Sequence, residues 1–269
     1  MNKNQKQSNG KHQTKRLIRR WHRRIGVAVS LWLILLAITG ILLNHSDDLS
    51  LQKSYVDSDW IINLYRIKAP QNIACFQPHK NDLSVCQIGD QIYLQNNWLL
   101  NTKRQLIGFY QLADFNYVIT QQDVFIYTSD WQLIEHFNLD NGLPGAISMV
   151  GTYSSKTNMA YQTQLLQVPL LFNIEGKTWL LDQELIWKVL DNKTINPQSV
   201  ISPTKNLKEQ LQQAYLYRQI TLLHFLQDLH SARIFSLTGK YLTDLVALLL
   251  IALSISGLIT WIKRNRKVI

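Results

Sequence analysis

Cysteine is scarce in this sequence, and the motifs that mark many enzymes and metal sites are missing. The 269 residues include two cysteines, Cys75 and Cys86, and seven histidines. There is no G-x-S-x-G, no H-E-x-x-H and no glycine loop that could hold a phosphate. Two cysteines are also too few for a zinc or iron–sulfur centre. The sequence therefore contains no motif typical of a hydrolase, a zinc enzyme or a nucleotide-binding protein.

Charge is absent from two long runs, residues 25–43 and 245–262. The first run has 19 residues, which as a helix would extend about 28 Å and match a bilayer core of about 30 Å. Tyr241 and Trp261 lie at the ends of the second run, where interfacial aromatic residues belong. A cleaved signal peptide would have a shorter apolar core and a small-residue cleavage site, which "LLNHSDD" lacks. We expect two uncleaved transmembrane helices.

Acidic residues are absent from both tails. Residues 1–24 contain nine Lys or Arg and residues 263–269 contain four, while residues 46–244 contain the other 15 together with all 18 Asp and Glu. Basic residues that flank membrane spans stay in the cytoplasm. We therefore expect both tails inside and the central part outside. The net charge of +10 belongs to the tails, so we expect no nucleic-acid partner.

The central part is expected to be mainly antiparallel β. Three stretches have a β-prone run, a polar turn and a second run with a tryptophan, which is typical of a hairpin: residues 89–100, 122–134 and 176–189. An aromatic residue lies near the middle of each first run: Tyr93, Phe125 and Trp179. Similar hairpins recur in propellers, which usually need four or more blades. The fold class expected is membrane α + β, with two transmembrane helices flanking an antiparallel-β domain of propeller-like hairpin repeats.

This interpretation divides the chain into seven segments. They are a basic tail (1–24), the first transmembrane helix (25–44), a connector (45–72), the β-rich domain (73–205), an amphipathic interfacial helix (206–240), the second transmembrane helix (241–262) and a basic tail (263–269). Cys75 and Cys86 lie in the exported part. An oxidising compartment there would favour a disulfide between them.

Histidines stand at the expected membrane edges. His22 and His45 are 23 residues apart, roughly 34 Å along a helix, so one chain cannot bring them to one site. His230 precedes the second apolar run by 15 residues. A break at Gly239 would let residues 221–237 lie along the outer membrane surface, where His230 could meet His45.

Two facing histidines can be the axial ligands of a haem iron. Small residues on both spans would permit close approach of a helix or a cofactor. The alternative is that the histidines hydrogen-bond to lipid headgroups or backbone and the small residues serve helix packing alone. Spacing by itself does not decide between these interpretations.

Residues 21–45 read "WHRRIGVAVSLWLILLAITGILLNH" and residues 228–264 read "DLHSARIFSLTGKYLTDLVALLLIALSISGLITWIKR". Both pieces resemble the membrane elements of the PepSY-associated transmembrane family. Its members typically open with H-R-x-x-G, end the first span in Asn-His and enter the last span through a D-L-H-S-G-R-like motif. The matching positions here are Trp21, His22, Arg24, Gly26, Asn44, His45, Asp228, Leu229, His230, Ser231 and Arg233.

The resemblance implies a bacterial inner-membrane protein with a periplasmic central domain, in a family often linked to iron uptake. Larger members resemble haem-bearing ferric-siderophore reductases. It favours haem b at the outer face with His45 and His230 as axial ligands, His22 at an inner haem, and Arg24 or Arg233 as partners of the propionates.

This chain departs from that pattern in two respects. It has two spans, and residues 245–262 contain no histidine, so His22 has no partner unless a homodimer supplies a second His22. Ala232 stands where the motif usually has glycine.

Two functions of different classes follow. The first is a haem-dependent electron-transfer or accessory component of iron or siderophore uptake, in contact with the lipid bilayer and with a partner of the uptake system. The second is a non-enzymatic membrane anchor whose β domain binds a periplasmic partner protein.

The charge asymmetry of the tails predicts the topology. A reporter that is active only outside the cytoplasm should be silent when it is fused after Ile269 and active when it is inserted near Ser155. Fusions of a cytoplasm-active reporter at the same two positions should give the reverse pattern. An active periplasmic reporter at the C-terminus would contradict the two-span hairpin.

Overall fold

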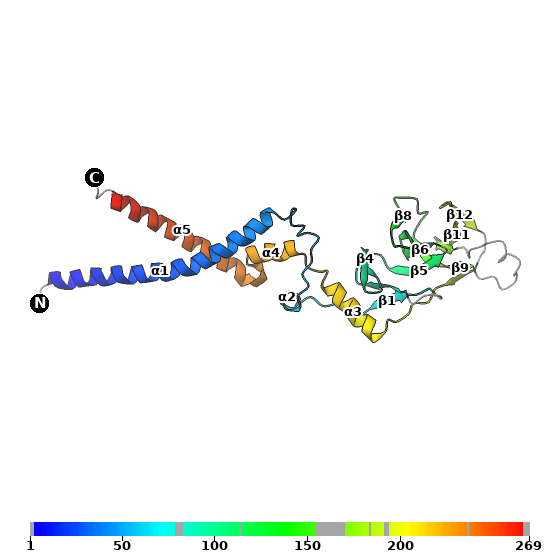
Figure 1. Ribbon diagram of the computed structural model, residues 1–269, viewed down its shortest axis with the longest axis horizontal. Helices are drawn as coiled ribbons and strands as arrows, with labels where there is room; N and C mark the ends of the chain where they lie inside the picture. Colours follow the sequence, from blue (N-terminus) through cyan, green and yellow to red (C-terminus); the bar gives the residue numbers. More distant parts are fainter. Residues whose placement is uncertain are drawn as a thin grey trace. The chain divides into compact units, whose positions relative to one another are not determined.

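The computed structural model describes residues 3–78, 83–112, 114–153, 170–182, 184–190, 194–235 and 237–265 (Figure 1). The chain forms two compact units. The helical unit consists of Met1–Ile67 and Tyr217–Ile269, and the β unit consists of Lys68–Leu216. Residues 266–269 of the expected C-terminal tail lie outside the described ranges.

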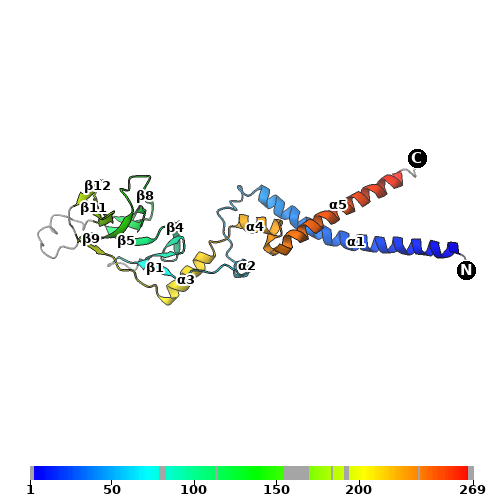
Figure 2. The ribbon, with the colours of Figure 1, turned by 180° about the vertical axis from the view of Figure 1, so that it is seen from behind.

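Two long helices dominate the helical unit. α1 (Lys3–Asn44) and α5 (Leu237–Asn265) cross each other, and the N-terminal end of α1 points the same way as the C-terminal end of α5 in both views (Figures 1 and 2). α1 continues through the basic tail, and α5 begins before the span expected at 241.

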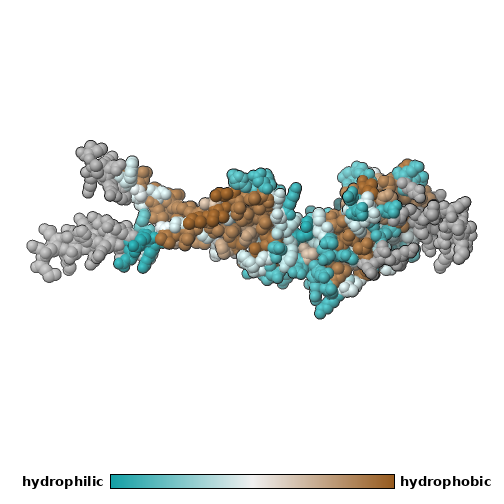
Figure 3. Space-filling model, viewed as in Figure 1, coloured by the Kyte–Doolittle hydropathy of each residue, from teal (hydrophilic) through white to brown (hydrophobic). Residues whose placement is uncertain are grey.

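Both helices are long and apolar enough to cross a membrane. The qualifying segments are Arg20–Asn44, with a mean hydropathy of 2.5, and Thr238–Ile259, with 2.3. Only 11% and 6% of an apolar 18-residue stretch within each segment are buried by the protein itself, and the side chains form a broad apolar surface (Figure 3). An uncovered apolar surface of this size is unfavourable in water, and a lipid environment removes the penalty. The two expected spans are confirmed as membrane-type helices flanking the β unit.

A small core closes the other end of the helical unit. α2 (Asp59–Leu64) and α4 (Leu222–His230) enclose Val56, Ile61 and Ile220. Backbone pairing holds the two chain segments together: Val56 N donates to Ile220 O at 2.9 Å, and Leu222 N donates to Ser54 O at 2.8 Å.

The single helix expected over residues 206–240 is divided in the structure. α3 (Lys205–Leu216) belongs to the β unit, and α4, a 3-10 turn (Arg233–Phe235) and α5 belong to the helical unit. The first break has a physical cause, because the backbone at Ile220 and Thr221 pairs with residues 55–56 instead of continuing the helix. Thr221 then caps α4, since its side chain accepts a hydrogen bond from His224 N at 3.1 Å.

Three antiparallel sheets build the β unit. The first has the order β1-β2-β3-β4, the second β5-β6-β7-β8, and the third β12-β11-β10-β9-β13. Their bounds are β1 (Ile73–Phe76), β2 (Val85–Ile88), β3 (Gln91–Leu94), β4 (Asn97–Asn101), β5 (Leu106–Leu112), β6 (Phe115–Thr120), β7 (Asp123–Thr128), β8 (Leu133–Asn138), β9 (Ile147–Tyr153), β10 (Leu170–Ile174), β11 (Lys177–Leu181), β12 (Trp187–Leu190) and β13 (Ile195–Pro197).

Each predicted hairpin forms one strand pair of a different sheet. These pairs are β3–β4, β7–β8 and β11–β12, and they carry Tyr93, Phe125 and Trp179 on their first strands. The mainly antiparallel character is confirmed. The sheets resemble separate blades, and no closed propeller or barrel forms within the described residues.

A disulfide joins Cys75 and Cys86 with an S–S distance of 2.04 Å, as expected. The two residues face each other across β1 and β2, and both are fully buried beside Leu211 of α3. The bond therefore ties the first hairpin together at the place where α3 packs on the sheet.

Removal of this disulfide should destabilise the β unit. With a sequence separation of 11, Cys75→Ala/Cys86→Ala should lower its free energy of unfolding by about 2–3 kcal/mol, because the unfolded chain regains loop entropy. Denaturant titration of the full chain in detergent measures this loss. In denaturant without reductant the unmodified protein should take up no alkylating reagent, whereas uptake at both thiols before reduction would show that the bond is absent.

Candidate functional site at the junction of α1, α4 and α5

His230, the last residue of α4, contacts the first membrane helix. Its Nδ1 lies 2.8 Å from Oγ1 of Thr39, which is 2% exposed within α1. The ring also covers Gly40, since a Cβ built there would lie 3.6 Å from His230 Cε1. α4 therefore reaches the first span through one imidazole and one hydroxyl.

The hydrogen-bond network assigns the tautomer of His230. Thr39 Oγ1 also lies 2.8 Å from the carbonyl oxygen of Leu35 and has only one proton, which it donates to that carbonyl. The lone pairs of the hydroxyl are then left to accept the proton of His230 Nδ1. A neutral His230 consequently has an unprotonated Nε2, the form in which a histidine binds a metal ion.

A buried carboxylate lies two residues before His230. Asp228 is 8% exposed, and its oxygens accept from the Tyr65 hydroxyl at 2.9 Å and from Arg233 Nε at 3.2 Å. His224 Nε2 is 3.3 Å from the same carboxylate. Arg233 also donates to Ser231 Oγ at 3.0 Å. A buried carboxylate needs such partners to offset its loss of hydration.

Tyr65 is the neutral donor of this network. Burial, followed by the hydrogen bond to Asp228, raises the pKa of its phenol well above the usual value. The hydroxyl therefore keeps its proton at physiological pH and donates it to the carboxylate. Tyr65 thereby fixes the connector after α2 to the helix that carries His230.

The chain reverses direction between α4 and α5 at Ala232, not at Gly239 as the sequence suggested. Ala232 has a φ of +56°, in the left-handed region that favours glycine. This conformation gives a physical reason for the glycine that the D-L-H-S-G-R-like motif usually has there. Gly239 lies within α5 and permits close approach, because a Cβ at Gly239 would lie 1.8 Å from the Ala232 carbonyl oxygen.

The other expected site residues are more exposed. His45 follows the last residue of α1, and its Nδ1 lies 3.1 Å from Asp48 Oδ2 on the surface. His22 and Arg24 are exposed on α1, a helix rise of about 32–34 Å from His45. The structure thus gives His45 and His230 different partners, Asp48 and Thr39, and keeps His22 and Arg24 away from both.

Three contributors to the junction were not expected as site residues. Thr39 is a single hydroxyl within an apolar run, and nothing in the sequence marks its contact with His230. Asp228 stands in the resembled motif, but its partner Tyr65 is 163 residues away along the chain. Among the described residues, no group of three or more His, Cys, Asp or Glu side chains could hold a metal ion by itself. The candidate metal ligands of the junction are therefore individual histidines.

Fold and junction together define a two-span membrane protein whose spans flank an antiparallel-β unit. The family model described as the PepSY-associated TM region matches residues 2–264, and the chain belongs to this family. The resemblance seen at the two ends is therefore confirmed over nearly the whole chain. No curated protein and no solved structure matches the chain.

The Ala232–Gly239 contact predicts a sharp steric requirement at the junction. Gly239→Ala should cost at least about 2–3 kcal/mol, because its Cβ would collide with backbone that cannot rotate away. The midpoint for heat-induced loss of monodisperse protein in detergent should fall by about 5–10 °C. Gly257→Ala on the same helix, where a Cβ meets nothing within 4 Å, is the matched control and should leave the midpoint nearly unchanged. Equal behaviour of the two variants would contradict the close approach.

Proposed function

We propose that this protein is a two-pass inner-membrane protein that binds haem b at its outer membrane interface and acts as an electron-transfer or accessory component of iron or siderophore uptake. His45 and His230 would be the axial ligands. The observation that carries this proposal is the hydrogen bond between His230 Nδ1 and Thr39 Oγ1.

The surroundings of His230 fit a ligand of haem iron. Metal-bound histidines usually donate their second ring N–H to an oxygen, which fixes the ring and the tautomer. Thr39 accepts that proton, and within the described residues no side chain or backbone group bonds to His230 Nε2. The ring therefore offers one lone pair without needing to break an existing contact.

The ring of His45 is also held at Nδ1 by a hydrogen-bond acceptor. Asp48 holds its Nδ1, which in the neutral ring leaves Nε2 for a ligand. The pair is exposed, and exposed pairs contribute little to stability, so a change of the His45 rotamer costs little. His224 is a weaker candidate, because its Nε2 already faces Asp228.

The arginines divide between the two membrane faces. Arg233 lies three residues after His230 and could share its guanidinium between Asp228 and a propionate, because only one of its donors, Nε, is used by that carboxylate and Ser231. Arg24 lies two residues after His22. These two residues could serve only an inner haem, completed by a second copy of the chain in a homodimer.

The proposed orientation rests on the basic tails. Nine and four Lys or Arg flank the two spans on the side of the termini, which favours cytoplasmic ends and a periplasmic β unit. This orientation puts His45 and His230 at the periplasmic face. Haem bound by two histidines supplies one-electron transfer without an open coordination position.

Absorption spectroscopy tests the ligand assignment. Protein purified in detergent from haem-replete cells should show a sharp Soret band, with α and β bands on reduction. His230→Ala and His45→Ala should each remove most of this signal. Thr39→Val keeps the side-chain shape but removes the acceptor of the His230 proton, and should weaken haem retention about 10–100-fold.

His136→Ala in the β unit is the matched control and should leave the spectrum unchanged. Colour that survives the loss of His45 would overturn the assignment of that ligand. A colourless preparation would refute the haem proposal and favour the non-enzymatic anchor.

A further inference from the structure

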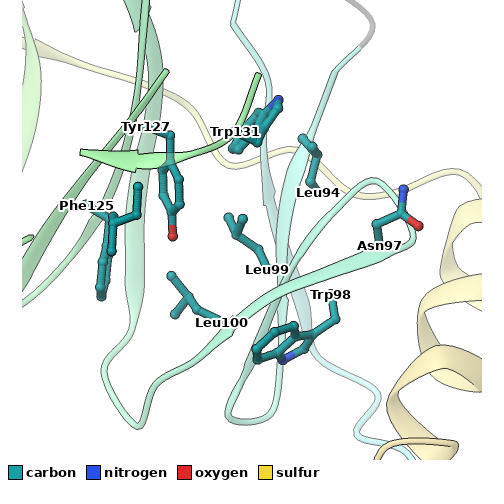
Figure 4. Close-up of a pocket in the computed structure, with 9 residues that line it drawn as sticks. Leu94, Asn97, Trp98, Leu99, Leu100, Phe125, Tyr127 and Trp131 are labelled. Carbon is teal, nitrogen blue, oxygen red and sulfur yellow. The ribbon is translucent and has the colours of Figure 1, made fainter. Parts of the chain in front are cut away.

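The β unit contains an open cavity of about 520 Å³ between its first two sheets (Figure 4). β4 supplies one wall, and β7, β8 and the turn between them supply much of the other. Its lining is Leu94, Asn97, Trp98, Leu99, Leu100, Phe125, Tyr127, Trp131 and Leu133. The size is in the range of pockets that hold small ligands or single side chains, which is about 300–1,000 Å³.

The lining of this cavity is almost entirely apolar and aromatic. Four of the nine residues are aromatic, four are leucines, and the remaining one is an asparagine. No charged side chain of the described residues lines the cavity, so it would desolvate a charged ligand without compensation. Aromatic faces and leucines instead favour an uncharged group of mainly apolar character.

Tyr127 provides a polar atom at the cavity wall. The residue is 6% exposed, and burial raises the pKa of its phenol to about 12. Figure 4 shows the hydroxyl directed into the space between Phe125, Leu99 and Leu100. Within the described part of the chain nothing accepts its proton. The hydroxyl opens to the cavity, so it is suited to donate to a bound molecule.

Trp131 is held in an unusual conformation at the same cavity. Its φ of +61° lies in the left-handed region, which is costly for a bulky residue. Its ring lies 5.7 Å from the rings of both Phe109 and Tyr127, and its backbone N–H donates to Thr128 O at 3.0 Å, which holds the turn that carries the ring. These contacts keep the indole fixed as part of the cavity wall.

One wall is also the outer strand of a sheet. β4 pairs only with β3, so the other side of its backbone has no strand partner among the described residues. An extended peptide can add to such an edge and place alternate side chains in an adjacent pocket. A carbonyl next to an apolar side chain would also supply the acceptor for Tyr127.

We propose that this cavity binds an uncharged aromatic or branched aliphatic residue of an extended peptide segment that lies along β4. The bound side chain occupies the space between Trp131 and Leu100, and an oxygen of the peptide accepts the Tyr127 proton. The site is independent of the haem proposal and gives the β unit a recognition function of its own.

Two soluble probes test this site on the full chain in lipid nanodiscs by saturation-transfer difference NMR. They are N-acetyl-L-phenylalaninamide and the peptide N-acetyl-Gly-Gly-Phe-Gly-Gly-amide, with empty nanodiscs as the blank. Both should bind, and the peptide should bind at least about fivefold more tightly because it also pairs with β4. Equal affinity would overturn the peptide assignment, and no binding of either probe would overturn the site.

Two pairs of variants locate the binding. Tyr127→Phe should lower the affinity about 2–10-fold by removing one hydrogen bond, whereas Tyr117→Phe, outside the cavity, should not. Leu133→Lys should lower it at least tenfold, whereas Ile134→Lys should not, because Leu133 lines the cavity and Ile134, the unpaired residue of the β-bulge opposite Tyr127, does not. Leu133 and Ile134 are both exposed, so both variants should fold, with an unchanged thermal midpoint and an intact Cys75–Cys86 disulfide. Equal effects within either pair would refute the location.

Discussion

The hydrogen bond between His230 and Thr39 is the contact on which the helical unit depends. It joins the element that leads into the second membrane helix to the last turns of the first, through the buried hydroxyl of Thr39. A polar contact of this kind is directional, whereas apolar packing between the two spans would tolerate rotation and sliding. The two helices therefore have a defined register at the end where α4 meets α1.

The hydrogen bonds and ion pairs of Asp228 stabilise the position of α4 against α1. Tyr65 comes from the connector, His224 from α4 itself, and Arg233 from the turn that leads into α5, so one carboxylate holds three parts of the chain. The reversal at Ala232 and the close approach of Gly239 then set the start of the second span. A site built on His230 is thus positioned by elements far apart in the sequence.

Much of the architecture could be predicted because it follows from local patterns. Uncharged runs of sufficient length mark the spans, and each hairpin carries its own β-prone strands and polar turn. The break between α3 and α4 could not be predicted in this way. The apolar spacing continues across it, and the helix is interrupted by backbone pairing of Ile220 and Thr221 with residues 55–56, which are distant in the sequence.

The candidate site was predictable only in part. The histidines at the membrane edges and the resembled motif pointed to His230 and to Arg233. The hydrogen-bond partners in this junction could not be predicted from the sequence, because they are distant along the chain. Thr39 lies 191 residues from His230, and Tyr65 lies 163 residues from Asp228. At Ala232 the sequence showed the departure from the motif but not its structural setting. The positive φ at this position explains why the motif usually has glycine there.

We propose that His230 offers its Nε2 to a haem iron while Thr39 accepts the proton of Nδ1. Low-temperature electron paramagnetic resonance of the oxidised protein tests this claim most directly. An iron held by two imidazoles should give a low-spin ferric signal, because both are strong-field ligands. A purified protein that contains no iron, or that shows only a high-spin ferric signal, would contradict it.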